Sequence, residues 1–230
     1  IVKDVAVELG VSIIGRSRNQ KLVIGQDFVT EELAVLGETL RFKHIENSFT
    51  QPNPSVNEKM VEWAMRGAIG LGGDLLELYC GAGNFTIAFA KIFDKVMATE
   101  ISKSSIAAAK ENMRFNSVEN IEFLRMDVND FIGAIDGVRE YNRMRGVDMS
   151  AYDLKSIFVD PPRSGLGEVS ALFSSRFENI IYISCNPQTL ELDLEMLTKT
   201  HEVVDMALFD QFAYTNHAEM GVILKKRSVL

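Results

Sequence analysis

Cysteine is scarce in this chain, and its scarcity narrows the class of protein. Only Cys80 and Cys185 occur among 230 residues. Small secreted proteins that depend on disulfides carry more cysteines, so a reducing cytoplasm is the expected compartment. No histidine cluster accompanies either cysteine, which argues against a structural zinc site, and we expect no metal.

Long apolar runs are missing as well. No segment approaches the roughly 20 apolar residues of a membrane span, and the first residues lack the basic-then-apolar pattern of a signal peptide. We therefore expect no membrane partner. The chain begins at Ile1 without an initiator methionine, which suggests a fragment of a longer protein or a trimmed one. Apolar residues make up 47%, enough for the core of one large α/β domain.

Basic residues are fewer than acidic residues, and the formal net charge is −8. Phosphate contacts normally dominate nucleic-acid affinity, so this balance argues against a polyanionic partner. Basic residues can nevertheless be concentrated locally, although solvated surface charge explains any one cluster equally well. Three small clusters occur: Arg16, Arg18 and Lys21; Arg139, Arg143 and Arg145; and Lys225, Lys226 and Arg227.

The first fifty residues differ in pattern from the rest. Residues 5–14 and 21–24 are short β-type runs broken by glycine and polar residues. Residues 51–54, Gln-Pro-Asn-Pro, interrupt the chain, and a helical pattern begins at Ser55. We expect a β-rich segment over residues 1–50 and the main domain over residues 51–230.

Strand-like and helix-like runs alternate from residue 75 onward. This alternation predicts an α/β fold with a mostly parallel sheet and helices on both faces, of the Rossmann-like kind. Residues 127–153 predict a helix followed by a polar excursion over the sheet edge. The expected strands are 75–79, 95–99, 121–126, 157–159, 180–184, 203–209 and 220–224, and the expected helices are 85–93, 103–115 and 190–198.

A glycine loop follows the first strand of this alternating region. Gly81 and Gly83 permit a tight turn and close approach of the backbone to a ligand. The third glycine of the dinucleotide fingerprint is absent, because Thr86 occupies its position, which argues against NAD and FAD. Glu100 ends the next strand, where a carboxylate would accept hydrogen bonds from the hydroxyls of a ribose. This combination of a glycine loop and a carboxylate is typical of a site for S-adenosylmethionine. The alternative is an ordinary tight turn in which Cys80 is a small buried residue.

Two further strands end in residues that can carry chemistry. Asp160 begins an Asp-Pro-Pro-Arg segment whose prolines impose a rigid, extended exit from the strand, so Asp160 should point into the cleft above the sheet. A rigid turn without chemistry is the alternative. Cys185 follows the apolar run at 180–184, where a thiol can serve as a nucleophile. An inert buried thiol is the alternative there.

Taken together, these motifs closely resemble the RNA 5-methyluridine methyltransferase family, in particular the bacterial tRNA (uracil-5-)-methyltransferases. The resemblance extends over nearly the whole chain. Family members carry a substantial N-terminal region, largely β, that helps to hold RNA, and residues 1–50 resemble only the end of it. The motifs are residues 48–53, 76–81, 98–101, 160–166, 184–187, 209–212 and 217–222.

The resemblance implies a function and a set of site residues. The implied reaction transfers a methyl group from S-adenosylmethionine to C5 of a uridine in the tRNA T-loop, through an adduct between Cys185 and C6, with Glu219 removing the C5 proton. Without the resemblance, Glu219 would be interpreted as a surface carboxylate. Aromatic residues such as Phe212 and Tyr214 could stack on the base. The implied cofactor-binding residues are Gln51, Tyr79, Gly81, Gly83, Asn84, Glu100 and Asp160.

Other functions remain open from the sequence alone. A sister enzyme acting on ribosomal RNA, or another structured RNA, is the nearest rival. A tRNA-binding folding helper with secondary methylation activity is a second alternative. An amino-methyltransferase is a third, although such enzymes carry Asn-Pro-Pro-aromatic in place of residues 160–163 and need no cysteine nucleophile. We expect the cluster of Arg139, Arg143 and Arg145 to contact phosphate, because it precedes the strand that ends at Asp160.

Overall fold

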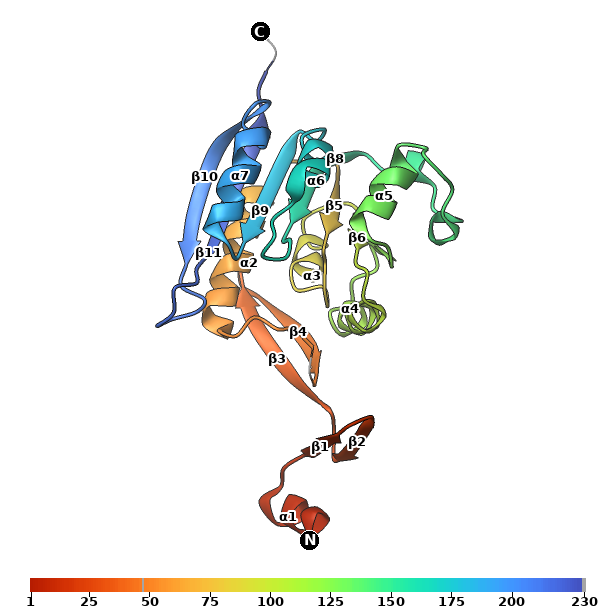
Figure 1. Cartoon of the computed structure of the whole chain (residues 1–230), viewed down its shortest axis with the longest axis vertical. Coiled ribbons are helices and arrows are strands. Elements are labelled where there is room, and N and C mark those ends of the chain that lie inside the picture. The colour runs from red at the N-terminus through yellow and green to blue at the C-terminus, as the bar shows by residue number, and fades with distance from the viewer. Residues whose placement is uncertain (47, 229–230) are drawn as a thin grey trace.

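The computed structural model describes residues 1–46 and 48–228. Its centre is a seven-stranded sheet in the order β10-β11-β9-β8-β5-β6-β7 (Figure 1). The α/β fold expected from the alternating pattern is confirmed. The strands are β5 (Asp74–Leu78), β6 (Val96–Thr99), β7 (Ile121–Leu124), β8 (Leu154–Val159), β9 (Asn179–Ser184), β10 (His201–Phe209) and β11 (Glu219–Lys226).

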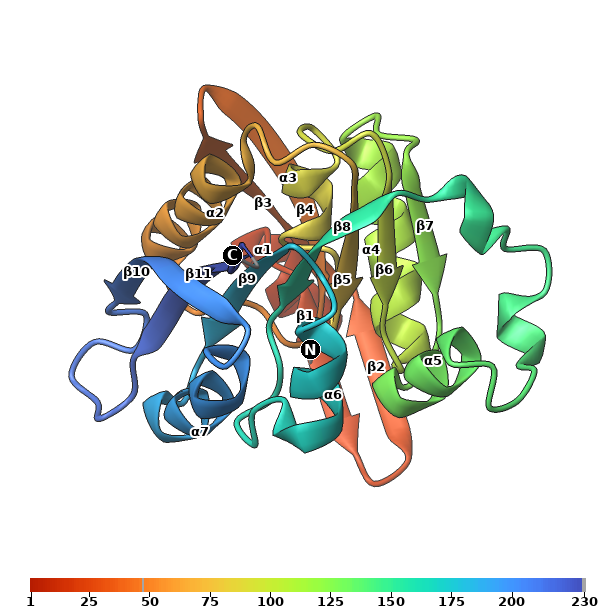
Figure 2. The ribbon, with the colours of Figure 1, turned by 90° about the horizontal axis from the view of Figure 1, so that it is seen from above.

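Helices cover both faces of the sheet (Figure 2). On one face lie α2 (Pro54–Ala68), α3 (Thr86–Phe89) and α4 (Lys103–Phe115), and on the other α5 (Val128–Ile135), α6 (Gly167–Ser174) and α7 (Pro187–Leu197). Each face has its own apolar core. Met60, Ile106 and Phe158 belong to the first core, and Phe131 and Tyr182 belong to the second.

Strand direction brings the chemistry-bearing residues to one edge of the sheet. Strands β5 to β9 run parallel, so all five end at the same edge. Tyr79, Glu100, Asp160 and Cys185 each directly follow one of these strands. Strand β11 runs antiparallel to β9 and therefore begins at that edge, where Glu219 is its first residue.

Helix ends follow from local sequence. The expected helix over 103–115 is confirmed as α4, and the side chain of Ser102 accepts a hydrogen bond from the backbone N–H of Ser105 at its start. Asn186 caps α7 in the same way, with Pro187 in the first turn. Helix α3 is shorter than the expected 85–93, and α6 has no counterpart among the expected elements.

The N-terminal segment departs from expectation in one place. Residues 5–14 were expected to be β, whereas Val2–Leu9 form helix α1, so that expectation is wrong for residues 5–9 and holds only for residues 13 and 14, which begin β1. Its apolar residues recur at helical spacing, and Gly10 ends it in the left-handed conformation with φ 62°. Strands do follow, as β1 (Ile13–Ser17), β2 (Gln20–Ile24), β3 (Phe28–Val35) and β4 (Glu38–Ile45).

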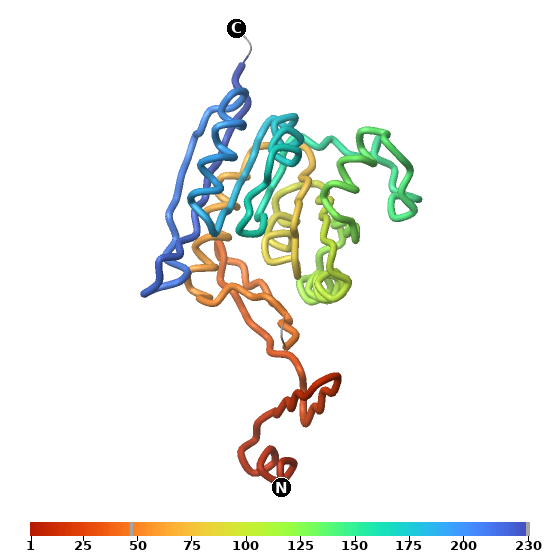
Figure 3. The backbone as a smooth tube through the Cα atoms, in the orientation of Figure 1, coloured from red at the N-terminus to blue at the C-terminus, as the bar shows by residue number. Residues whose placement is uncertain are grey.

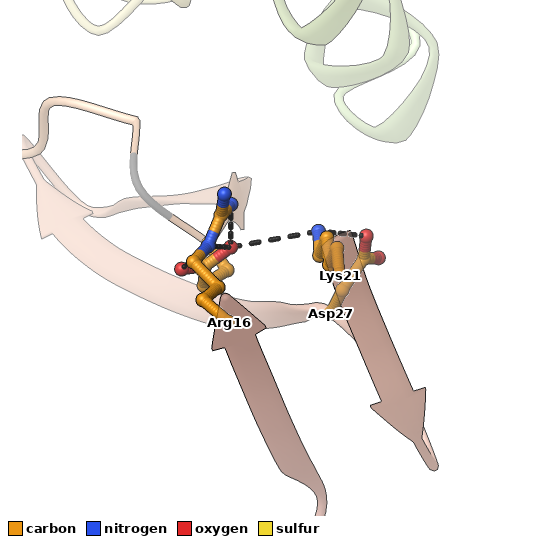
Figure 4. A network of polar contacts seen from close by, with 4 residues as sticks. Arg16, Lys21 and Asp27 are labelled. Carbon is orange, nitrogen blue, oxygen red and sulfur yellow. Dashed lines mark hydrogen bonds and ion pairs between the residues drawn. The ribbon is translucent and has the colours of Figure 1, made fainter. Parts of the chain in front are cut away.

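The beginning of the chain projects from the body of the molecule (Figure 3). An ion-pair network ties the β1–β2 hairpin to the ends of the β3–β4 hairpin (Figure 4). Arg16 Nε donates to Glu46 Oε1 at 2.9 Å, and Lys21 Nζ lies 2.8 Å from Asp27 Oδ2 and 3.5 Å from Glu46 Oε2. These side chains are partly exposed to solvent, which screens their attraction, so the pairs add little to stability.

Strands β3 and β4 belong to the main core. Leu33, Val35, Leu40 and Phe42 are buried there together with residues of α2 and α4. Because this hairpin shares a core with α2 and α4, packing marks no boundary at residue 50. The division between residues 1–50 and 51–230 stays a prediction. Within residues 1–46 and 48–228, no helix is long and apolar enough to cross a membrane.

Candidate active site

A cavity of about 490 Å³ opens at the edge where the parallel strands end. Its volume lies in the range typical of small-molecule sites. It is lined by eight residues that were predicted from the sequence: Gln51, Tyr79, Gly81, Asn84, Glu100, Asp160, Cys185 and Glu219. It is also lined by residues that were not predicted, such as His44, Phe49 and Glu77. Gly83 does not line the cavity.

The glycine loop has the backbone that its sequence suggests. Gly81 and Gly83 have φ of 55° and 86°, which favours glycine at both positions. A Cβ on Gly81 would meet no protein atom within 4 Å, so the loop leaves space for a ligand there. Gly83 instead lets the loop pack on α4, where a Cβ would lie 3.5 Å from that of Ala109. Tyr79 also has positive φ, at 62°, a conformation that costs free energy and is concentrated at functional sites.

The Glu100 carboxylate is held by backbone amides. Its Oε2 accepts from Gly81 N at 3.2 Å, and its Oε1 accepts from Ser102 N at 2.6 Å. The carboxylate is thereby fixed beside the glycine loop. Each oxygen keeps a lone pair for a further donor, such as a ribose hydroxyl.

Two side-chain amide pairs bridge distant segments at the cavity. Asn84 and Asn57 of α2 exchange reciprocal hydrogen bonds of 2.9 Å. Gln211 Nε2 donates to Gln51 Oε1 at 2.8 Å. Asn57 and Gln211 are each about 2% exposed, and no sequence motif indicates either pairing.

Asp160 and Glu219 form a carboxyl pair with altered proton affinity. Burial, together with the charge of Glu219, raises the pKa of Asp160 to about 8. Burial raises the pKa of Glu219 to about 7, and its Oε2 has no hydrogen-bond partner among the described residues. Near neutral pH the pair therefore keeps at least part of one proton, and Glu219 is poised to exchange it.

The thiol of Cys185 is partly open to the cavity. Burial raises its pKa, and the charges of Glu219 and Asp160 raise it further, whereas the charge of Arg163 lowers it. Arg163 Nη2 lies 3.1 Å from His217 Nδ1, and the backbone oxygen of Arg163 accepts from Asn186 Nδ2 at 2.9 Å. These contacts join the three loops that carry Asp160, Cys185 and Glu219.

Cys80 differs from Cys185 in its surroundings. It is buried, and burial followed by the charges of Glu77 and Glu100 raises its pKa well above the ordinary value. A thiol in these surroundings stays protonated and is a poor nucleophile.

Unpaired acceptors mark where a ligand with donor groups would fit. Glu77 Oε2 lies buried at the cavity without a hydrogen-bond partner among the described residues. Burial raises the pKa of Glu77 well above its ordinary value. Together with the free space at Gly81 and the fixed carboxylate of Glu100, this arrangement suits a ligand that carries an adenosine and an amino group.

The pH dependence of stability should report the carboxyl pair. Because the pKa values of Asp160 and Glu219 are raised on folding, the folded state binds more protons than the unfolded state from about pH 4 upward, so stability falls as pH rises and levels off above about pH 8. Between about pH 5 and pH 8 we expect the free energy of unfolding to fall by about 1.4 kcal/mol per pH unit for each extra proton that the folded state retains. Denaturant melts at several pH values measure this slope. Glu219→Gln should flatten it, and an equal slope in both proteins would refute the assignment.

The Arg139, Arg143 and Arg145 cluster lies elsewhere. It belongs to the excursion that precedes the amino end of β8, whereas Asp160 follows the carboxyl end of that strand. Arg139 is paired with Asp130 at 3.2 Å and lies over the ring of Tyr141. Because the cluster precedes the amino end of β8, it lies toward the opposite edge of the sheet from Cys185, and its contact with phosphate stays a prediction.

Comparisons with known proteins agree on one family. The family model of tRNA (Uracil-5-)-methyltransferases matches residues 2–227. The tRNA/tmRNA (uracil-C(5))-methyltransferase of Sulfurimonas denitrificans is 62% identical over 227 residues, covering 99% of this chain and 62% of the relative. The relative of the same name from Nitratiruptor is 52% identical, covering 97% of this chain and 62% of that protein.

A solved structure extends the agreement to the fold. The Pyrococcus abyssi tRNA (uracil-54, C5)-methyltransferase, solved in complex with S-adenosyl-L-homocysteine, superposes with a TM-score of 0.69 at 26% identity. The match covers 93% of this chain and 50% of that one. The chain thus spans 62% of the length of the two curated relatives. With a family match over residues 2–227, the chain belongs to the tRNA (uracil-5-)-methyltransferase family.

Proposed function

We propose that this chain carries the catalytic part of an S-adenosylmethionine-dependent enzyme that methylates C5 of a uridine in the T-loop of tRNA. The observation that carries the proposal is the single cavity lined by the Gly81 loop, Glu100, Cys185 and Glu219. Such a cavity brings together a nucleophile, a base and a nucleoside-binding loop. The names of the relatives, which specify tRNA and tmRNA, favour tRNA over ribosomal RNA.

The residues around the glycine loop would hold the cofactor. Glu100 would accept from the ribose hydroxyls, and Tyr79 and Asn84 would flank the adenosine. Gly81 would allow close approach, with Gly83 shaping the turn. Asp160 and Gln51 would lie where the cofactor and the target base meet. When bound, S-adenosylmethionine supplies an electrophilic methyl group on a sulfonium.

Cys185 would start the reaction. C5 of uracil is too weak a nucleophile to attack a methyl sulfonium directly. The Cys185 thiol gives up its proton to a carboxylate of the cavity, and addition of the resulting thiolate to C6 forms a C–S bond and moves the C5=C6 electron pair onto C5 and the neighbouring O4. C5 can then take the methyl group, and the electron pair of the broken S–CH₃ bond stays on the cofactor's sulfur.

Glu219 would complete the reaction. After methylation, C5 carries both the methyl group and its original proton. The Glu219 carboxylate removes that proton, the C–H electron pair restores the C5=C6 bond, and the thiolate leaves C6. The raised pKa of Glu219, about 7, suits a base that acts near neutral pH.

The product identifies the reaction and the substrate. Incubation with labelled S-adenosylmethionine and a tRNA T-arm should yield 5-methyluridine at one position, identified by mass spectrometry of the digested nucleosides. A T-arm with cytidine at that position should stay unlabelled. Methylation of a ribosomal-RNA fragment in preference to the T-arm would point to the rival substrate, and methylated adenine would contradict the proposed reaction.

Glu100 provides a separate test of the cofactor site. Glu100→Ala should raise the Kd for S-adenosylhomocysteine by about 10-fold or more, because a charge-assisted hydrogen bond is worth roughly 1.5–3 kcal/mol. Isothermal titration calorimetry measures the effect without RNA. Glu119→Ala, at an exposed position outside the cavity, is the matched control. Equal affinity in wild type and Glu100→Ala would contradict the proposed site.

A further inference from the structure

The buried amide of Gln211 has a geometry that the reaction described above does not use. Gln211 follows β10 and begins the loop that leads to Glu219 at the start of β11. Phe209 and Glu219 are direct partners in the β10–β11 ladder, and Gln211 N donates to Phe209 O at 2.9 Å. Gln211 is therefore fixed at the base of the loop that carries Glu219.

Gln211 determines which way the amide of Gln51 faces. Gln211 Nε2 donates to Gln51 Oε1 at 2.8 Å across 160 positions of sequence. An amide whose oxygen is occupied as an acceptor must present its two N–H groups elsewhere. Gln51 lines the cavity together with Cys185 and Glu219. The contact with Gln211 occupies the oxygen of Gln51 and leaves its two N–H groups free of Gln211, in a side chain that lines this cavity.

The cost of this arrangement indicates that it has a use. Gln211 is about 2% exposed, and its Oε1 has no hydrogen-bond partner among the described residues. A buried carbonyl oxygen without a hydrogen-bond partner lowers the stability of the folded state. An apolar side chain of similar length, such as methionine, would fill the space without that penalty but could not orient Gln51.

We propose that Gln211 is a positioning residue that fixes Gln51 as a hydrogen-bond donor to O4 of the target base and so selects uracil over cytosine. This inference rests on the proposed function. Uracil carries a carbonyl acceptor at C4, whereas cytosine carries an amino donor there. The same donor would also stabilise O4 as it gains negative charge when Cys185 adds to C6.

Two variants test the proposal through base selectivity. Each is assayed for 5-methyluridine and 5-methylcytidine formation on T-arms with uridine or cytidine at the target. Gln211→Met should lower kcat/KM for uridine by roughly 10- to 100-fold, with the Kd for S-adenosylhomocysteine within about 3-fold of wild type. Gln51→Glu keeps an acceptor for Gln211 but removes the donors, so the preference for uridine over cytidine should fall as well.

A double-variant cycle separates positioning from folding. If Gln211 acts through Gln51, then Gln211→Met should add little to the loss already caused by Gln51→Ala. A merely structural role would instead give additive losses, unchanged base selectivity and a lowered Tm. Wild-type rates and selectivity in Gln211→Met would overturn the inference while leaving the proposed function intact. If neither the unaltered chain nor the full-length Sulfurimonas denitrificans relative methylates either T-arm, both are overturned.

Discussion

Replacing Cys185 with alanine should lower the rate of methyl transfer to a tRNA T-arm by at least ~10³-fold, because the uracil ring then has no nucleophile at C6. The side chain lies at the carboxyl end of β9 and is only partly buried, so its loss should leave the fold intact. The Kd for S-adenosylhomocysteine should change by less than about 3-fold. Single-turnover transfer of a labelled methyl group measures the loss.

The other cysteine provides the matched control. Cys80→Ala removes the buried thiol, and its rate should stay within a few-fold of wild type. Equal rates in Cys185→Ala and wild type would exclude covalent catalysis by this thiol. They would also favour the amino-methyltransferase alternative. RNA remodelling that persists in Cys185→Ala would instead add a folding-helper activity to the catalytic one.

Replacing Glu219 with glutamine should stall the reaction after methyl transfer. The amide cannot remove the C5 proton, so the methylated base stays bonded to Cys185. Turnover should fall by about 10²- to 10⁴-fold, the usual contribution of a general base. A protein–RNA complex that survives denaturation should accumulate with ordinary uridine RNA, and gel electrophoresis under denaturing conditions detects it.

A carboxylate at the other end of the same strand pair tests whether the effect is specific. Glu202 lies exposed on β10, paired with Lys225 of β11, and Glu202→Gln should behave like wild type. Normal turnover in Glu219→Gln would contradict the role of Glu219. Loss of activity without an accumulating complex would place Glu219 before methyl transfer rather than after it.

The central sheet, and the position of Glu100, Asp160 and Cys185 at its carboxyl edge, could be predicted from sequence because each depends on a local pattern. A parallel strand buried on both faces has a nearly continuous apolar run, and the residue after that run lies at the carboxyl edge. Glu100, Asp160 and Cys185 each follow such a run. The expected helix at 103–115 was confirmed because its alanine-rich pattern and the cap at Ser102 are local signals.

The remaining features depend on contacts between distant segments. The Gln51–Gln211 and Asn57–Asn84 pairs join residues that no motif spacing relates, so sequence alone could not reveal them. Helix α1 was missed because valine-rich runs have a high β propensity, although here their spacing is helical. Glu77 lies within a strand, where its carboxylate gave no sign that it would be buried at the cavity.

The account depends above all on a covalent bond between Cys185 and C6 of the target uridine. A T-arm with 5-fluorouridine at the target, incubated with the chain and S-adenosylmethionine, tests it directly. Fluorine cannot leave C5 as a proton, so the adduct should be trapped as a denaturation-stable complex that mass spectrometry locates at Cys185. Cys185→Ala should give none. A complex of equal yield with Cys185→Ala, or no complex with either this chain or the full-length Sulfurimonas denitrificans relative, would contradict the account.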